Sequence, residues 1–297
     1  MFYIVPITIT DAMLVSSSVA ETDYTAGSAG TAYSVGNRVM RAVAGVHANF
    51  ERLVAGTTAT APENDPINWV RVGPTNRWAM LDGAVGTSTS GTASISVTLT
   101  PGVVRGLALL DLDVEGVTVT MVVDGDTVYT RVIDPVGSQE DVDSWYAYFF
   151  EAIQRRRTVV LTDLPAYGEA EITITATGAG AISIGSCVLG PIYELGDVQV
   201  DASVGIVDYS KKNVDDFGVV TVAERAYAKR MTLPLMLATN TVSVAAQRLA
   251  RIRAKPVVWI GSADIDALIV YGFVKSWSID IPGLVLSTCT LEIEGLV

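Results

Sequence analysis

VTVTMVVDGDTVYTRVI, residues 117–133, decides the fold class of this chain. Val, Thr, Ile and Tyr dominate both halves, and these β-branched and aromatic residues are typical of strands. Asp124 and Gly125 separate the halves, and both residue types tolerate the positive φ angles of a two-residue hairpin turn. The stretch therefore predicts an antiparallel β-hairpin.

Similar strand-like runs lie on both sides of this hairpin, separated by short turns; they cover residues 93–99, 103–112, 157–164, 170–176 and 181–190. Many short strands at close spacing predict a β-sandwich or jelly roll. The glycine-rich stretch 178–185 leads into a strand rather than a helix, so it lacks the helix N-terminus of a phosphate-binding loop. We expect it to form a turn.

The pattern changes towards the C-terminus, where a strand at 221–237 and a helix at 241–255 precede three further strands at 256–262, 267–280 and 286–295. The apolar helix positions recur at 3.6-residue spacing and are Val242, Ala245, Leu249 and Ile252. Thr241 and Ser243 are candidate helix caps. This order predicts an α+β domain with one helix on an antiparallel sheet.

The polar side of that helix carries Arg248, Arg251 and Arg253. On an acidic chain this positive stripe is a candidate subunit interface, because arginine is enriched at interfaces. The alternative is a solvated face whose arginines pair with nearby carboxylates.

The composition shifts predict four segments in a mainly β protein. These are an N-terminal strand and arm at 1–23, a small β module at 24–73, a β-sandwich or jelly roll at 74–196, and the α+β domain at 197–297. Residues 11–32 are rich in Ser, Ala, Thr and Gly and favour a linker or irregular arm. We expect the first strand, at 2–10, to pack on one of the larger β-domains.

The net charge of −12 argues against a nucleic-acid partner, which would need clustered Lys and Arg. No apolar run reaches the roughly 18–20 residues of a membrane helix, so we expect no membrane insertion. The opening MFYIVPITIT lacks the basic residues of a signal peptide, and assembly in a cytoplasm is expected. Cys187 and Cys289 lie in apolar surroundings and are predicted to be buried free thiols.

A catalytic constellation is not recognisable, and we expect no enzyme activity, no cofactor and no metal ion. His47 is the only histidine, and no Ser or Cys lies near it at a spacing typical of a catalytic pair. We interpret it as a surface-loop residue. The carboxylates Asp111, Asp113 and Glu115 lack the distal glutamate of a calcium loop and favour a solvated turn. A glycan-degrading enzyme that uses Asp111 or Asp143 is the rival hypothesis.

The small module resembles the short chitin-binding modules of bacterial chitinases. The resemblance rests on Tyr33-Ser-Val-Gly36-Asn37-Arg-Val39, on Phe50-Glu-Arg-Leu53 with Ala55-Gly56, and on Pro66 and Trp69. It implies a carbohydrate site, for which Tyr33 and Trp69 are the candidates, and Trp78 in the following segment is the third candidate. The adjacent exposed aromatics of that family are replaced here by RLVAGTT at 52–58, so we expect Tyr33 and Trp69 to form a small core.

The middle segment resembles a galactose-binding-like jelly roll. NRWAMLDG at 76–83 is similar to the first strand of that fold, and 170–196 is similar to its last hairpin. This resemblance concerns the fold, which hosts many unrelated functions.

Two C-terminal stretches, 204–231 and 270–297, resemble tail proteins of long-tailed bacteriophages and prophages, which show the same order of units. The resemblance implies a structural protein of the virion tail, in the baseplate or tail tip. The implied partners are other tail proteins and copies of the chain itself. The alternative is a tail adhesin that binds polysaccharide on the host surface.

Overall fold

The computed structural model describes residues 1–43, 45–135, 144–150, 156–214, 217–263 and 265–296. Strands make up 53% and helices 10%, and the sheets are antiparallel, which confirms the predicted mainly β class. The chain forms two compact units, Ile7–Val188 and Met1–Pro6 with Leu189–Val297. The finer segment boundaries proposed from the composition stay predictions.

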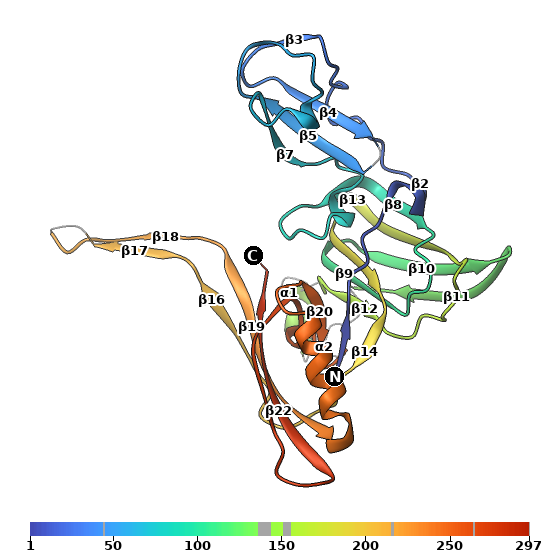
Figure 1. Cartoon of the computed structure of the whole chain (residues 1–297), viewed down its shortest axis with the longest axis vertical. Coiled ribbons are helices and arrows are strands. Elements are labelled where there is room, and N and C mark those ends of the chain that lie inside the picture. The colour runs from blue at the N-terminus through green and yellow to red at the C-terminus, as the bar shows by residue number, and fades with distance from the viewer. Residues whose placement is uncertain (44, 136–143, 151–155, 215–216, 264, 297) are drawn as a thin grey trace. The chain divides into compact units, whose positions relative to one another are not determined.

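The Ile7–Val188 unit is built around a seven-stranded sheet with the order β11-β10-β13-β8-β2, in which β9 pairs with β12 and β13 (Figure 1). Its strands are β2 (Leu14–Ser17), β8 (Thr89–Leu99), β9 (Gly106–Asp113), β10 (Gly116–Val123), β11 (Asp126–Ile133), β12 (Val159–Leu161) and β13 (Glu171–Gly190). A short helix, α1 (Trp145–Phe150), and a 3-10 turn, Ala79–Leu81, complete this part.

The hairpin predicted at 117–133 is confirmed. Val123 pairs with Asp126, and Asp124 and Gly125 have φ angles of 52° and 89°. Alternate residues of β10, namely Val117, Val119 and Met121, are buried. One face of β10 therefore lies in the core, because successive side chains of a strand point to opposite faces of its sheet.

The glycine-rich turn predicted within 178–185 is wrong, and so is the hairpin predicted at 170–196. Residues 171–190 form the single strand β13, which pairs with β8 along both halves around a register shift between Thr177 and Ala181. A Cβ atom on Gly185 would lie 2.9 Å from the Leu110 carbonyl oxygen. This glycine permits close approach of the neighbouring backbone rather than a change of direction.

The small module within this unit consists of a three-stranded sheet and a two-stranded one. The strands β4 (Arg38–Val43), β5 (Val46–Arg52) and β7 (Trp69–Pro74) pair in that order, and β3 (Ala32–Tyr33) pairs with β6 (Gly56–Thr57). The expected irregular arm at 11–32 also contains a 3-10 turn, Asp11–Met13, and the strand β2, which pairs with β8.

The other unit holds an eight-stranded sheet with the order β14-β1-β20-β21-β22-β19-β15, and β16 also pairs with β19. The strands are β1 (Phe2–Ile4), β14 (Ile192–Glu194), β15 (Asp197–Val198), β16 (Ser203–Asp208), β19 (Tyr227–Ala238), β20 (Val257–Ile260), β21 (Ile269–Asp280) and β22 (Leu286–Gly295). The first strand, expected at 2–10, is shorter and lies between β14 and β20.

Helix α2 (Val242–Arg251) lies on this sheet, as predicted, but is shorter than the expected 241–255. Ala245, Leu249 and Ile252 are buried in the core with strand residues such as Leu235, and Val242 is partly buried. The expected cap is wrong, because the Thr241 hydroxyl donates to the Ala238 carbonyl instead of capping the helix.

The strand predicted at 221–237 is interrupted at 224–226. Its first part, β18 (Val220–Ala223), pairs with β17 (Lys211–Val214), and its second part is β19. In Figure 1, β17 and β18 extend away from the rest of their unit as a narrow two-stranded ribbon, beyond β16 and the start of β19.

Candidate functional site

Trp69, one of the first two carbohydrate candidates, lies in the core of the small module, and Tyr33 is partly buried and packs against that core. Their rings meet edge to face, 5.0 Å apart at 73°, and Trp69 is only 3% exposed. The Arg52 guanidinium covers the Trp69 ring at 5.0 Å. Trp69 also packs with Val39, Ala48 and Phe50. These two side chains therefore form no exposed aromatic platform.

Trp78, the third candidate, is also buried. It stacks on His47, with ring centroids 4.4 Å apart and an interplanar angle of 22°. The structure thus places Trp78 beside the histidine rather than beside Tyr33 and Trp69.

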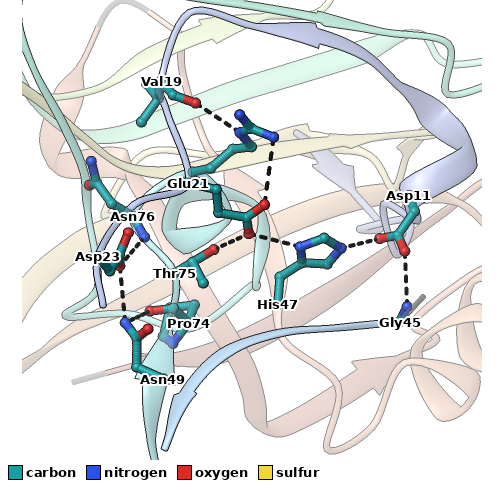
Figure 2. A network of polar contacts seen from close by, with 11 residues as sticks. Asp11, Val19, Glu21, Asp23, Gly45, His47, Asn49, Pro74, Thr75 and Asn76 are labelled. Atoms are coloured by element: carbon teal, nitrogen blue, oxygen red, sulfur yellow. Dashed lines mark hydrogen bonds and ion pairs between the residues drawn. The ribbon is translucent and has the colours of Figure 1, made fainter. Parts of the chain in front are cut away.

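His47 is the centre of a polar network (Figure 2). It lies on β5, and its side chain is only 16% exposed, so the surface-loop interpretation is wrong. Nε2 lies 2.7 Å from Asp11 Oδ1, and Nδ1 lies 2.8 Å from Glu21 Oε1. The second carboxylate oxygen of Asp11 accepts a hydrogen bond from the Gly45 backbone amide at 3.1 Å.

Glu21 connects His47 to the chain that follows the module. Its Oε1 atom accepts a hydrogen bond of 2.6 Å from the Thr75 hydroxyl, and its Oε2 atom lies 3.5 Å from the Arg77 guanidinium. Arg77 Nε also donates to the Val19 carbonyl at 2.8 Å. Both ends of the module, near residues 21 and 75, are therefore tied to β5.

A third carboxylate, Asp23, makes similar contacts with Asn49, two residues beyond His47 on β5. It accepts hydrogen bonds from Asn49 Nδ2 at 3.0 Å and from the Asn76 backbone amide at 2.8 Å. Asn49 also donates to the Pro74 carbonyl at 3.2 Å. Figure 2 shows the two groups side by side along β5.

No local sequence pattern indicates this network, because His47 is separated from Glu21 by 26 positions and from Asp11 by 36. Chemically, the network contains a histidine, carboxylates and a hydroxyl. However, the Thr75 hydroxyl donates to Glu21, so His47 does not activate it as a nucleophile. The contacts hold backbone segments together, and we interpret the network as a structural junction.

A cavity of about 380 Å³ lies within the small module, and His47 forms part of its lining. Its lining includes Phe50, Glu63, Trp69 and Arg71. Arg41 donates two hydrogen bonds to Glu63, at 2.8 and 2.9 Å. These bonds hold the pKa of Glu63 below its ordinary value. The cavity therefore combines aromatic walls with a carboxylate that is already paired with an arginine.

The helix arginines do not form one outward-facing stripe. The Arg248 guanidinium lies 5.4 Å from the Tyr193 ring centroid, and its Nη1 atom approaches the Glu194 carbonyl at 3.5 Å. Arg251 and Arg253 are exposed, as expected. Arg248 is thus engaged within its own unit, and the interface role of all three residues stays a prediction.

Of the two acidic residues proposed for a glycan-degrading enzyme, the structure describes only Asp111. Asp111 is exposed and lies 3.6 Å from an Arg157 guanidinium nitrogen, whereas Asp143 lies outside the described residues. Among the residues that the structure describes, no group of three or more His, Cys, Asp or Glu side chains has the geometry to hold a metal ion. Asp113 and Glu115 therefore belong to no such group.

Cys187 and Cys289 are free and buried, as predicted. Burial raises the pKa of Cys187 to about 12, and burial raises that of Cys289 to about 11. Neither thiol is poised to act as a nucleophile near neutral pH.

Comparison with known proteins gives no family assignment, because neither any protein-family model nor any curated protein matches the chain. Within the described part of the chain, no helix has the length and apolar character needed to cross a bilayer. The case for a function therefore rests on the sequence resemblances and on the structure's own features.

Proposed function

We propose that this chain is a non-enzymatic structural component of a bacteriophage tail, at the baseplate or tail tip. The support is the resemblance of 204–231 and 270–297 to tail proteins, together with the order of units that precedes them. A chitin-binding-like module and a galactose-binding-like jelly roll would then serve as rigid parts of a scaffold. The expected location is the virion, after assembly in the host cytoplasm.

The burial of Trp69 and Trp78 favours a scaffold role over an adhesin role. Stacking on a sugar requires an exposed aromatic face. Trp69 is covered by Arg52 and Tyr33, and Trp78 is covered by His47. The same side chains that would bind a glycan are used to hold the module together.

The polar network favours the scaffold as well. Asp11, Glu21 and Asp23 fix both ends of the small module to β5 through hydrogen bonds of 2.6–3.1 Å. These bonds restrict the motion of the module's ends relative to β5, although within the described residues the buried side-chain oxygen of Asn49 has no hydrogen-bond partner. A module held at both ends suits a part with a fixed place in an assembly.

Gold-labelled antibody against the chain, applied to intact virions of a phage that encodes it, tests the proposal. We expect label at the distal end of the tail in electron micrographs. The control is the same antibody preincubated with purified protein, which should remove the label. Particles that contain no copy of the chain by mass spectrometry would refute the tail role.

The second candidate function is a polysaccharide-binding adhesin, and the cavity beside Trp69 favours it. Arg71 lines this cavity and is exposed, so Arg71→Ala should leave the module folded. Glycan-array binding by the wild-type protein that is lost in Arg71→Ala would support the adhesin. Release of reducing ends from cell-wall glycan would instead support the glycan-degrading enzyme.

A further inference from the structure

A second cavity, of about 320 Å³, lies beside Asp23 at one end of the polar network. Its walls come from the segment before the small module, from strands β5 and β7, and from the chain that follows β7. All of these belong to the Ile7–Val188 unit. The volume lies at the lower end of the range of about 300–1,000 Å³ that small-ligand sites occupy.

Asp23 carries the only formal charge among the described residues that line this cavity. Its Oδ2 atom accepts hydrogen bonds from Asn49 Nδ2 and from the Asn76 backbone amide, as Figure 2 shows, and both donors are uncharged. Within the described part of the chain, no Lys, Arg or His side chain forms an ion pair with Asp23, and its Oδ1 atom accepts no hydrogen bond. This partly buried carboxylate therefore lacks a compensating cation.

Asn49 adds a second unused acceptor to the same cavity. It is only 8% exposed, and its side-chain oxygen has no hydrogen-bond partner among the described residues. The amide orientation is fixed, because Nδ2 donates to two acceptors, Asp23 Oδ2 at 3.0 Å and the Pro74 carbonyl at 3.2 Å. A buried acceptor without a donor is destabilising. The unused hydrogen-bonding capacity of Asp23 and Asn49 thus consists of acceptors, which favour a ligand that donates.

Tyr24 places an aromatic ring at the cavity and is 40% exposed. The face of such a ring attracts cations. Arg38 reaches the Tyr24 hydroxyl at 3.4 Å, but its Nε atom is paired with Glu51 at 2.8 Å. Arg38 therefore leaves the charge of Asp23 uncompensated, and the ring and the carboxylate both favour a cationic ligand.

The acceptors also distinguish between kinds of cation. Calcium prefers about six to eight oxygen ligands, usually with several carboxylates, and here a single carboxylate lines the cavity. A guanidinium pairs best with both oxygens of a carboxylate in one plane, but Asp23 Oδ2 already accepts two hydrogen bonds. A primary ammonium is a compact charge whose three donors can reach separate acceptors.

We propose that this cavity binds a primary ammonium group on an aliphatic stem. The ammonium donates to Asp23 Oδ1 and to the side-chain oxygen of Asn49, and the stem packs on Tyr24 and Val72. The lysine side chain of a polypeptide and a free aliphatic amine share this chemistry. The inference goes beyond the proposed tail role and does not depend on it.

Titration of the full 15N-labelled chain, followed by NMR at constant ionic strength, tests this inference. Nα-acetyl-lysine methylamide should cause saturable shifts of the Asn49 side-chain amide and of the Tyr24 and Ser88 backbone amides. The same compound acetylated on its ε-nitrogen should cause none. Tetramethylammonium, which has no N–H donor, should bind about tenfold more weakly or worse. A wild-type chain without saturable shifts, or equal binding of all three compounds, would overturn the inference.

Two variants test the residues. Asp23→Asn removes the charge but keeps an oxygen that accepts from the Asn76 amide, and it should weaken binding of the lysine compound about tenfold or more. Asp126→Asn, on β11 and outside the cavity, is its control and should bind as the wild type does.

Tyr24→Ala should weaken binding about two- to fivefold, through loss of the ring face. Tyr167→Ala is the matched control, because Tyr167 is 44% exposed and does not line the cavity. If Asp23→Asn does not fold, the Tyr24 pair still decides. A Tyr24→Ala variant that binds as tightly as the wild type would overturn the site.

A further comparison identifies the source of the ammonium. The compound n-pentylamine has the same aliphatic ammonium as the lysine compound but no peptide groups. Tighter binding of the lysine compound supports the site and assigns it to a polypeptide, whereas equal or tighter binding of n-pentylamine supports the site and assigns it to a free amine. Tighter binding of Nα-acetyl-arginine methylamide than of either would overturn the inference. Label at the tail tip would still support the proposed function in that case.

Discussion

His47 lies nearly parallel to Trp78, with their ring centroids 4.4 Å apart, while both imidazole nitrogens face carboxylate oxygens of Asp11 and Glu21. The imidazole ring thus packs on Trp78 through its face and contacts two carboxylates through its edge. Three stretches of chain meet there: the segment before the module, strand β5, and the segment that follows β7. The junction should therefore be sensitive to this one side chain.

His47→Ala should lower the free energy of unfolding by about 1–3 kcal/mol, because it removes the side chain that contacts the largely buried Glu21 carboxylate and packs on Trp78. Urea titration followed by tryptophan fluorescence measures the change, and Trp78 reports on it directly. Arg38→Ala is the control, since its pair with Glu51 is 44% and 32% exposed and should contribute about 0–1 kcal/mol. Equal effects of the two changes would contradict a junction role.

Glu63→Gln should alter the dependence of stability on acid. Hydrogen bonds from Arg41 lower the pKa of Glu63 below its ordinary value of 4.5. A depressed folded pKa stabilises the protein above that ordinary value, and the contribution is lost as the pH falls through the folded pKa. The melting temperature of the wild type should exceed that of Glu63→Gln near neutral pH, and the gap should close in acid. A gap that grows as the pH falls would refute this assignment.

Leu249→Ala should destabilise the C-terminal unit by about 2–5 kcal/mol, because it opens a cavity between α2 and the sheet. Leu249 is 1% exposed and packs in the core cluster of this unit. Gln247→Ala, two residues earlier on the exposed side of the helix, should change stability by no more than about 0.5 kcal/mol. Chemical denaturation of both variants provides the comparison.

The two thiols should be unreactive in the folded protein. Because burial raises the pKa of Cys187 to about 12 and that of Cys289 to about 11, little thiolate is present at pH 8. A thiol reagent such as dithiobisnitrobenzoate should react slowly with the native chain and fully after denaturation. A Val222→Cys variant should add one fast-reacting thiol, because Val222 is 64% exposed. Rapid reaction of the wild-type chain would show that one of the two thiols is accessible.

The sequence predicted those parts of the fold that depend on local spacing. Asp124 and Gly125 specify a turn by themselves, and the 3.6-residue repeat of Ala245, Leu249 and Ile252 specifies one buried helix face. Both signals act over a few residues. For this reason the hairpin and the helix were predicted, although the helix ends were not.

The errors arose where a residue's role depends on a distant partner. Gly185 resembles a turn residue, but it lies within a strand. There its lack of a side chain lets the backbone of Leu110 in a neighbouring strand approach closely. His47 appeared isolated because Asp11 and Glu21 reach it only after the chain has folded. A single sequence does not reveal which distant segments meet, so the junction was not foreseen.

The position of β1 has a consequence for the order in which the chain is completed during synthesis. Phe2 pairs with Glu194 on one side and with Ile260 on the other, so the strand fills a slot between β14 and β20. All strands that surround the core of Ile7–Val188 have left the ribosome long before β20 is made. The first strand therefore gains both of its neighbours only after β20 has been made, although β14 is available earlier. A fragment of residues 189–297 would retain the empty slot, and a separate peptide with the sequence MFYIVP would complement it in trans.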